Sequence, residues 1–151
     1  MSTLKNDLLT ELTKNNLDLT KTNNDACPCC SGKSYQHCCE PLHQEKIFAL
    51  SAEQLMRSRF SAFSLGLVDY LKMTWDKNTC PKDLAIDKAI KWTKLSINDC
   101  KKGSKKDQQG WVTFVAYYEA NGTPGALHEK SYFIKDTNGH WRYVDGELKN
   151  S

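Results

Sequence analysis

Five of the seven cysteines lie within the thirteen residues from 27 to 39. Two thiols one residue apart, eight intervening residues and two adjacent thiols give the spacing C-x-C-x8-C-C. If the chain reverses at Ser31-Gly32, four sulfurs can meet at the corners of a tetrahedron, which is the geometry that zinc favours. The spacing therefore predicts a zinc site with the ligands Cys27, Cys29, Cys38 and Cys39.

Other interpretations of the cysteines stay open. Disulfides or reduced thiols would need no metal, although vicinal cysteines pair poorly and residues 1–25 have no signal-peptide pattern. An iron–sulfur cluster also uses four cysteines, but the close spacing favours a single metal ion. Four thiolates around zinc would carry two excess negative charges, which we expect Lys33, His37 and the backbone N–H groups of the turn to moderate. Cys30 would then be a spare thiol.

The segment from Cys27 to Cys39 resembles the SEC-C motif, named after the zinc-binding C-terminal tail of the SecA translocation ATPase. That pattern reads C-P-C-x-S-G-x-x-Y-x-x-C-[CH], and the only departure is Cys30, where the family usually has glycine. The resemblance implies protein recognition, because the SecA tail contacts an export chaperone and ribosomes. With four thiolate ligands, no coordination position would remain open for catalysis.

Helical periodicity follows the cysteine segment. A helix is predicted over residues 50–63, because Ser51 can act as the N-cap, Gln54 completes a capping box and Gly66 can end the helix. Shorter helices are predicted over residues 68–75 and through residues 84–89. Beyond residue 91 the pattern changes to that of strands, at residues 92–99, 111–119, 127–135 and 140–146. Helices followed by antiparallel strands predict an α+β fold, with the helices on one face of a curved sheet.

Residues 26 to 147 together resemble the YchJ-like family of SEC-C proteins. The resemblance is carried by the cysteine segment and by stretches such as residues 55–63, 92–95 and 141–146. It implies a nuclear transport factor 2-like domain, a cone in which a bent sheet wraps a helix and can enclose a pocket, but no particular activity. We expect a polar extension over residues 1–25, a zinc knuckle over residues 26–45 and the cone over residues 46–149.

Several polar residues could share the pocket of such a cone. His128 and Glu129 are neighbours on a predicted strand, so only one of them can face the pocket. A buried Glu129 beside an arginine would serve either an acid/base or anion-binding site, or an ion pair that fixes the helix against the sheet. We favour the ion pair and assign no catalytic residue. The pocket candidates are Arg57, Arg59, Asp69, Tyr70, His128, Glu129, Ser131, Tyr143 and Asp145.

Composition bounds the partners. The net charge is +3, and the basic residues 101–106 have no interleaved aromatic side chain to stack a base, so we do not expect nucleic acid binding. No apolar run approaches the ~20 residues that span a bilayer, and we expect a cytoplasmic protein. The first residues would form a short amphipathic helix or a polar tail. Homodimers are common in folds of this type, and we expect one here.

The sequence thus predicts a protein-interaction or adaptor module with a structural zinc. The alternative is a small-molecule-binding protein or enzyme, similar to an isomerase or dehydratase, that uses the cone pocket and keeps the zinc as a clamp.

Overall fold

The computed structural model describes residues 25–149, so the expected N-terminal extension lies almost wholly outside the described part. One four-stranded sheet has the order β1-β2-β3-β4, and every neighbouring pair is antiparallel. No helix within residues 25–149 is long and apolar enough to cross a membrane. The elements are η1 (Tyr35–His37), α2 (Glu40–His43), α3 (Ala52–Leu65), α4 (Val68–Met73), β1 (Ile90–Lys102), β2 (Gln109–Ala120), β3 (Thr123–Lys135) and β4 (Trp141–Leu148).

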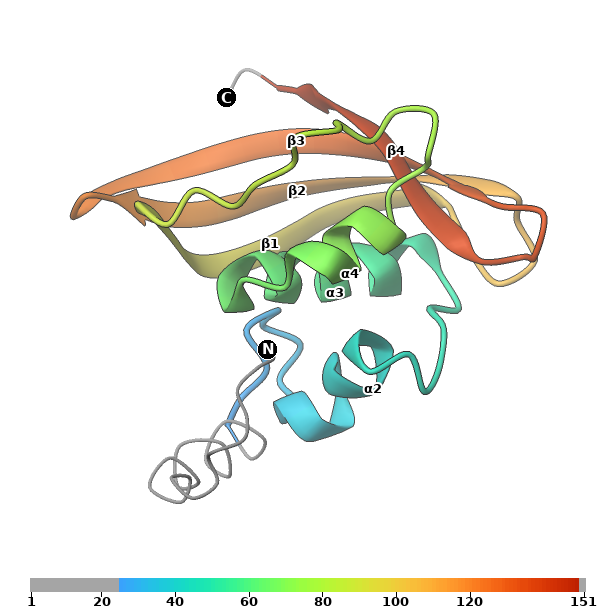
Figure 1. Cartoon of the computed structure of the whole chain (residues 1–151), viewed down its shortest axis with the longest axis horizontal. Helices are drawn as coiled ribbons and strands as arrows, with labels where there is room; N and C mark the ends of the chain where they lie inside the picture. Colours follow the sequence, from blue (N-terminus) through green and yellow to red (C-terminus); the bar gives the residue numbers. More distant parts are fainter. Residues whose placement is uncertain (1–24, 150–151) are drawn as a thin grey trace.

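The curved sheet forms one layer, α3 and α4 form a second, and the cysteine segment with α2 lies on the other side of the helices (Figure 1). Helix α3 packs against β1, β2 and β4. The main core lies between α3 and the sheet and includes the fully buried side chains of Leu55, Val112, Phe133 and Trp141. The predicted α+β fold with helices on one face of a curved antiparallel sheet is therefore confirmed.

Helix α3 begins after a side-chain cap at Ser51 and ends at a glycine, Gly66. The Ser51 hydroxyl accepts a hydrogen bond from the Gln54 amide at 3.0 Å, and the Gln54 side chain accepts one from the Leu50 amide at 2.8 Å. These two bonds satisfy amides that the helix itself leaves unpaired. Gly66 then takes the left-handed conformation, with φ of 76°, and ends the helix. The cap and the stop agree with the sequence pattern.

The predicted helix through residues 84–89 is wrong, because this segment has no helical hydrogen bonds and leads directly into β1. Leu84 and Ile86 are half-buried and pack against a cluster that includes Leu42 and Leu71. Side chains two residues apart point the same way in extended chain, whereas in a helix they do not. The apolar residues at positions 84 and 86 therefore fit an extended segment.

Two strands contain extra residues that change which side chains face the core. In β1 the pairing slips at Thr93 and again at Asn98. The first slip lets Trp92 and Leu95 both face the core although they are three residues apart. In β4 the pairing slips at Val144, between the partners of Tyr132 and Phe133. Strict alternation, as assumed from the sequence, would have placed other side chains of β4 against α3.

Candidate functional site

The four cysteines chosen from the spacing lie together. Their sulfur atoms are all within 4.8 Å of one another, with Cys29 Sγ 3.6 Å from Cys38 Sγ, and Cys38 Sγ 3.9 Å from Cys39 Sγ. A tetrahedral zinc site with Zn–S bonds of about 2.3 Å has sulfur–sulfur edges of about 3.8 Å. Three of the four residues are buried, and Cys38 is half-buried. The cluster could therefore hold a metal ion.

A tight turn brings the first pair of cysteines to the second. The Cys27 amide donates to the Lys33 carbonyl at 2.9 Å, and the Cys30 amide donates to the Cys27 carbonyl at 3.1 Å. Cys30 and Gly32 both have positive φ, of 64° and 93°. The short helix η1 then delivers Cys38 and Cys39 beside the turn. Cys30 itself is exposed and is not part of the sulfur cluster.

Hydroxyl groups and an arginine, rather than the expected Lys33 and His37, surround the sulfurs. Ser31 Oγ lies 3.1 Å from Cys38 Sγ, and Ser61 Oγ of α3 lies 3.4 Å from Cys39 Sγ and 3.5 Å from Cys27 Sγ. Arg57 Nη1 donates to the Cys29 carbonyl at 2.8 Å. Lys33 and His37 are exposed, and Nδ1 of His37 is 3.0 Å from Ser34 Oγ. The turn thus supplies Ser31 and helix α3 supplies Ser61 and Arg57 as neighbours of the cysteine cluster.

The thiols influence one another strongly. Hydrogen bonds from Cys29 and Cys39 lower the pKa of Cys27, so one thiolate is stabilised within the cluster. The bond to Cys27, together with burial, raises the pKa of Cys29 to about 11, and the pKa of Cys39 is raised for the same reasons. After the first ionisation, further thiolates would face a negative charge at close range. A bound divalent cation would remove that cost.

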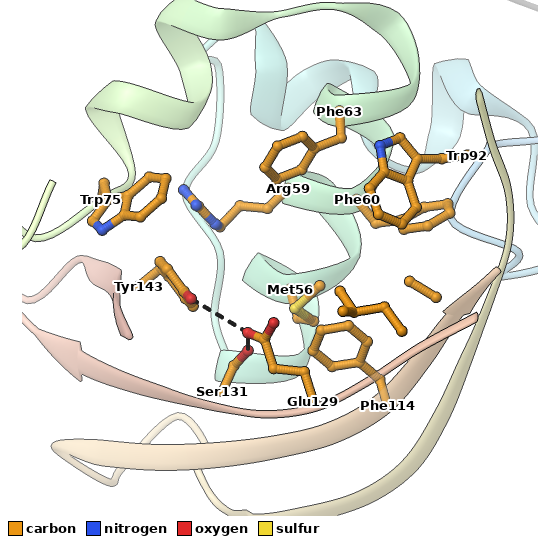
Figure 2. A pocket seen from close by; sticks show the side chains of 12 residues that line it. Met56, Arg59, Phe60, Phe63, Trp75, Trp92, Phe114, Glu129, Ser131 and Tyr143 are labelled. Carbon is orange, nitrogen blue, oxygen red and sulfur yellow. Dashed lines mark hydrogen bonds between the residues drawn. The ribbon is translucent and has the colours of Figure 1, made fainter. Parts of the chain in front are cut away.

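A second candidate site is a cavity of about 130 Å³ between α3 and the sheet (Figure 2). Its wall is mainly aromatic, and Trp75 and Trp92 are only half-buried, so they form part of its rim. Two charged side chains point into it, one from α3 and one from β3. The lining residues are Met56, Arg59, Phe60, Phe63, Trp75, Trp92, Phe114, Ala116, Leu127, Glu129, Ser131 and Tyr143.

Arg59 is the buried cation of the cavity, with 3% of its surface exposed. Its Nη1 donates to the Leu71 carbonyl at 2.9 Å and to Thr74 Oγ1 at 2.7 Å, which ties α3 to the end of α4. The guanidinium carbon lies 4.8 Å from the Trp75 ring and 4.5 Å from the Tyr143 ring, close enough for cation–π attraction. Burial lowers the pKa of Arg59 to about 10, so it is charged at neutral pH.

Glu129 is the carboxylate of the cavity. Its Oε2 accepts hydrogen bonds from Ser131 Oγ at 2.6 Å and from the Tyr143 hydroxyl at 3.3 Å (Figure 2). Burial raises the pKa of Tyr143, and the Glu129 charge raises it further. A Cβ at Gly146 would overlap the Glu129 carboxylate, so the glycine in β4 makes room for this side chain. Within residues 25–149, no ion pair joins Glu129 to an arginine.

The structure brings four of the nine pocket candidates to this cavity: Arg59, Glu129, Ser131 and Tyr143. It also adds aromatic residues that are not among those candidates, such as Trp75 and Trp92. No local pattern separates an aromatic side chain that fills a core from one that borders a cavity, because that depends on what lies opposite.

The other five candidates lie elsewhere. Arg57 faces the cysteine segment, and Tyr70 bonds to Ser58 Oγ on the far side of α3, at 2.7 Å. Asp69 is exposed. His128 lies on the outer face of β3 because Glu129 takes the inner one. Asp145 is exposed on the outer face, because the extra residue Val144 turns Tyr143 and Asp145 to opposite faces.

Two family models match the chain. The model described as the YchJ middle domain, which is nuclear transport factor 2-like, matches residues 51–146, and the SEC-C motif matches residues 24–41. A UPF0225 protein from Streptomyces coelicolor is 43% identical over 122 residues, covering 81% of this chain and 94% of the relative. A UPF0225 protein from Cupriavidus pinatubonensis is 37% identical over 127 residues, covering 81% and 87%.

Two solved structures are also similar. The solution structure of a SEC-C motif containing protein from Rhodopseudomonas palustris has a TM-score of 0.73 and 32% identity, and the match covers 82% of this chain and 98% of that one. The crystal structure of a SEC-C motif containing protein from Psychrobacter arcticus has a TM-score of 0.67 and 28% identity, and the match covers 87% and 86%.

Proposed function

The chain belongs to the YchJ-like family of SEC-C motif proteins with a nuclear transport factor 2-like domain, and on this basis we propose that its four cysteines hold a structural zinc and that the knuckle, residues 26–45, recognises a protein partner. The observation that carries the zinc assignment is the cluster of four sulfurs, all within 4.8 Å of one another, in which two of the distances are 3.6 and 3.9 Å and fit tetrahedral Zn–S bonds. Four thiolates would fill every ligand position. The ion would therefore cross-link the knuckle and leave no open position for a substrate.

Surface features beside the knuckle support the recognition role. Ile47 and Phe48 follow α2 and are adjacent exposed apolar side chains, with exposed fractions of 47% and 44%. Ile47 borders a hollow of about 380 Å³ that lies between the knuckle and the first turns of α3, with Lys33, Cys38 and Gln54 among its other lining residues. A segment of a partner could bury Ile47 there and pair with the polar rim.

The experiment is native mass spectrometry of the protein purified from its own host without chelator. We expect a mass with one zinc per chain and a co-purifying protein. Ile47→Asp should keep the zinc and the fold but lose the partner, because it places a charge in the apolar contact. Glu129→Gln, whose side chain is remote from this hollow, should keep both.

Each outcome bears on one part of the proposal. A metal-free protein would overturn the zinc site. A partner retained by Ile47→Asp, or by a zinc-free Cys38→Ser protein, would overturn recognition through the knuckle and leave the zinc assignment intact.

A second candidate function is the binding of a small molecule in the cavity beneath α3. It is favoured by one observation: Arg59 and Glu129 both line the cavity, yet within residues 25–149 neither forms an ion pair. Arg59 is buried and Glu129 is half-buried. Charges in such positions that serve only stability are expected to pair, because an unpaired charge away from water is costly. Here their charges are left facing a common space.

A further inference from the structure

Arg59 and Glu129 give the cavity one positive and one negative charge. Both lie at the Tyr143 end, because the guanidinium carbon is 4.5 Å from the Tyr143 ring and the carboxylate is 3.3 Å from the Tyr143 hydroxyl. An anionic ligand would be attracted by Arg59 but repelled by Glu129, and a cationic ligand the reverse. The balance of charge at this end therefore favours an uncharged ligand.

The same two side chains have unused hydrogen-bonding atoms. Among residues 25–149, no hydrogen bond reaches Nε or Nη2 of Arg59, whose Nη1 makes both of its bonds. Likewise, within that range only Oε2 of Glu129 accepts hydrogen bonds, from Ser131 and Tyr143. The cavity thus offers N–H donors beside a carboxylate acceptor. A complementary ligand would present an acceptor and a donor close together.

The remainder of the cavity is apolar and suits a flat ring. Met56, Phe60 and Phe114 form its inner wall, and the half-buried rings of Trp75 and Trp92 stand at the rim (Figure 2). Its volume of about 130 Å³ is close to that of an engineered cavity of about 150 Å³ that binds benzene. One ring with a small polar group is the largest ligand of this type that would be enclosed.

We propose that this cavity binds an uncharged single-ring compound with a hydrogen-bond acceptor and a donor attached to the same carbon, as in a primary carboxamide. The acceptor receives a hydrogen bond from Arg59, and the donor gives one to Glu129. The ring packs among Phe60, Phe114 and Trp92. This inference rests on the second candidate function and names the ligand class for it.

Three single-ring probes of similar size differ in the charge of their polar group: benzamide is uncharged, benzoate is an anion and benzylammonium is a cation. Each is titrated into the full-length protein while the indole N–H signals of Trp75 and Trp92 are followed by nuclear magnetic resonance. We expect benzamide to bind roughly tenfold more tightly than either charged probe, the size of one charge-assisted hydrogen bond.

The Glu129→Gln variant tests the role of the carboxylate. Gln can still accept the Ser131 hydrogen bond, so the fold is expected to persist, but the cavity gains a net positive charge. The preference should then reverse in favour of benzoate. Gly146→Ala should weaken benzamide binding as well, because its Cβ displaces the Glu129 carboxylate. His128→Gln, one residue away on the outer face, is the matched control and should change nothing.

The outcomes distinguish the two levels of the proposal. If no probe shifts the indole signals, both the ligand class and the second candidate function are overturned. If benzoate or benzylammonium binds best to the unaltered protein, the cavity is a ligand site but the uncharged class is wrong. An unchanged preference in Glu129→Gln would exclude Glu129 as the acceptor.

Discussion

At the scale of the residue, Cys30 departs from the SEC-C pattern, and its backbone conformation should lower the stability of the fold. Cys30 has φ of 64°, a left-handed conformation that glycine adopts freely and other residues adopt at about 1–2 kcal/mol. The SEC-C pattern usually has glycine here. The chain still forms the turn with cysteine at this position. The Cys30 sulfur accepts a weak hydrogen bond from the amide of Leu95 in β1, at 3.5 Å.

Replacing Cys30 by glycine should relieve this strain. We expect Cys30→Gly to raise the free energy of unfolding by about 1 kcal/mol and to leave one zinc per chain, because Cys30 lies outside the sulfur cluster. Chemical denaturation and metal analysis measure the two effects. Cys30→Ser keeps a Cβ and should show no gain in stability. Loss of zinc from the glycine variant would instead identify Cys30 as a ligand.

At the scale of the element, the β1–β2 hairpin meets the first turn of α3. The Ala52 amide donates to the Gly103 carbonyl at 2.9 Å, which satisfies a helix-end amide. Gly110 pairs with Lys102, the residue before Gly103. A Cβ at Gly103 would lie 2.8 Å from Ala52 Cβ, and a Cβ at Gly110 would overlap Gly103 Cα. Two glycines therefore allow the sheet to approach the helix.

A methyl group at Gly110 should disturb this contact. Its Cβ would overlap the backbone of Gly103 and lie 3.3 Å from Ala52 Cβ, so we expect Gly110→Ala to reduce the free energy of unfolding by about 3 kcal/mol. Gly125→Ala is the matched control, because its Cβ meets only the end of the Tyr118 side chain, which can rotate away. Urea denaturation compares the two. If both variants lose the same free energy of unfolding, the close approach of the backbone at Gly110 does not contribute more to stability than the contact at Gly125.

At the scale of the whole molecule, the knuckle and the cone each have a core of their own. The knuckle buries Cys27, Cys29, Tyr35 and Cys39 in its own cluster, while the cone has the larger core between α3 and the sheet. Polar contacts link them, because Arg57 bonds to the Cys29 carbonyl and His43 Nε2 donates to the Ser58 carbonyl at 2.8 Å. A third apolar cluster adds to the link, because Leu42 of the knuckle packs against Ala62 of α3 and Leu71 of α4. The expected homodimer stays a prediction.

Removal of the metal should therefore affect the two cores unequally. We expect chelation to abolish hydrogen-exchange protection of the Cys27, Cys30 and Tyr35 amides, which belong to the knuckle turn. Amides of β2 and β3, in the middle of the sheet, should stay protected, and zinc should restore the knuckle. Loss of protection throughout the sheet after chelation would mean that the cone depends on the metal to fold.

The sequence by itself determined the features that a few neighbouring residues encode. The cysteine spacing identified the four clustered sulfurs, the cap at Ser51 and the stop at Gly66 bounded α3, and alternation located the strands. Neighbouring residues suffice for these features because hydrogen bonds and turn geometry act over three or four positions.

Only the tertiary structure decided which side chains meet. Because of the extra residue Val144, Tyr143 and Asp145 lie on opposite faces of the sheet. The orientation of α3 points Arg57 toward the knuckle and Arg59 into the cavity. Ser61, far along the chain, became the neighbour of the sulfurs. Such contacts depend on strand register and helix orientation. Many contacts between residues distant in the sequence together determine both, so no local sequence pattern predicts them.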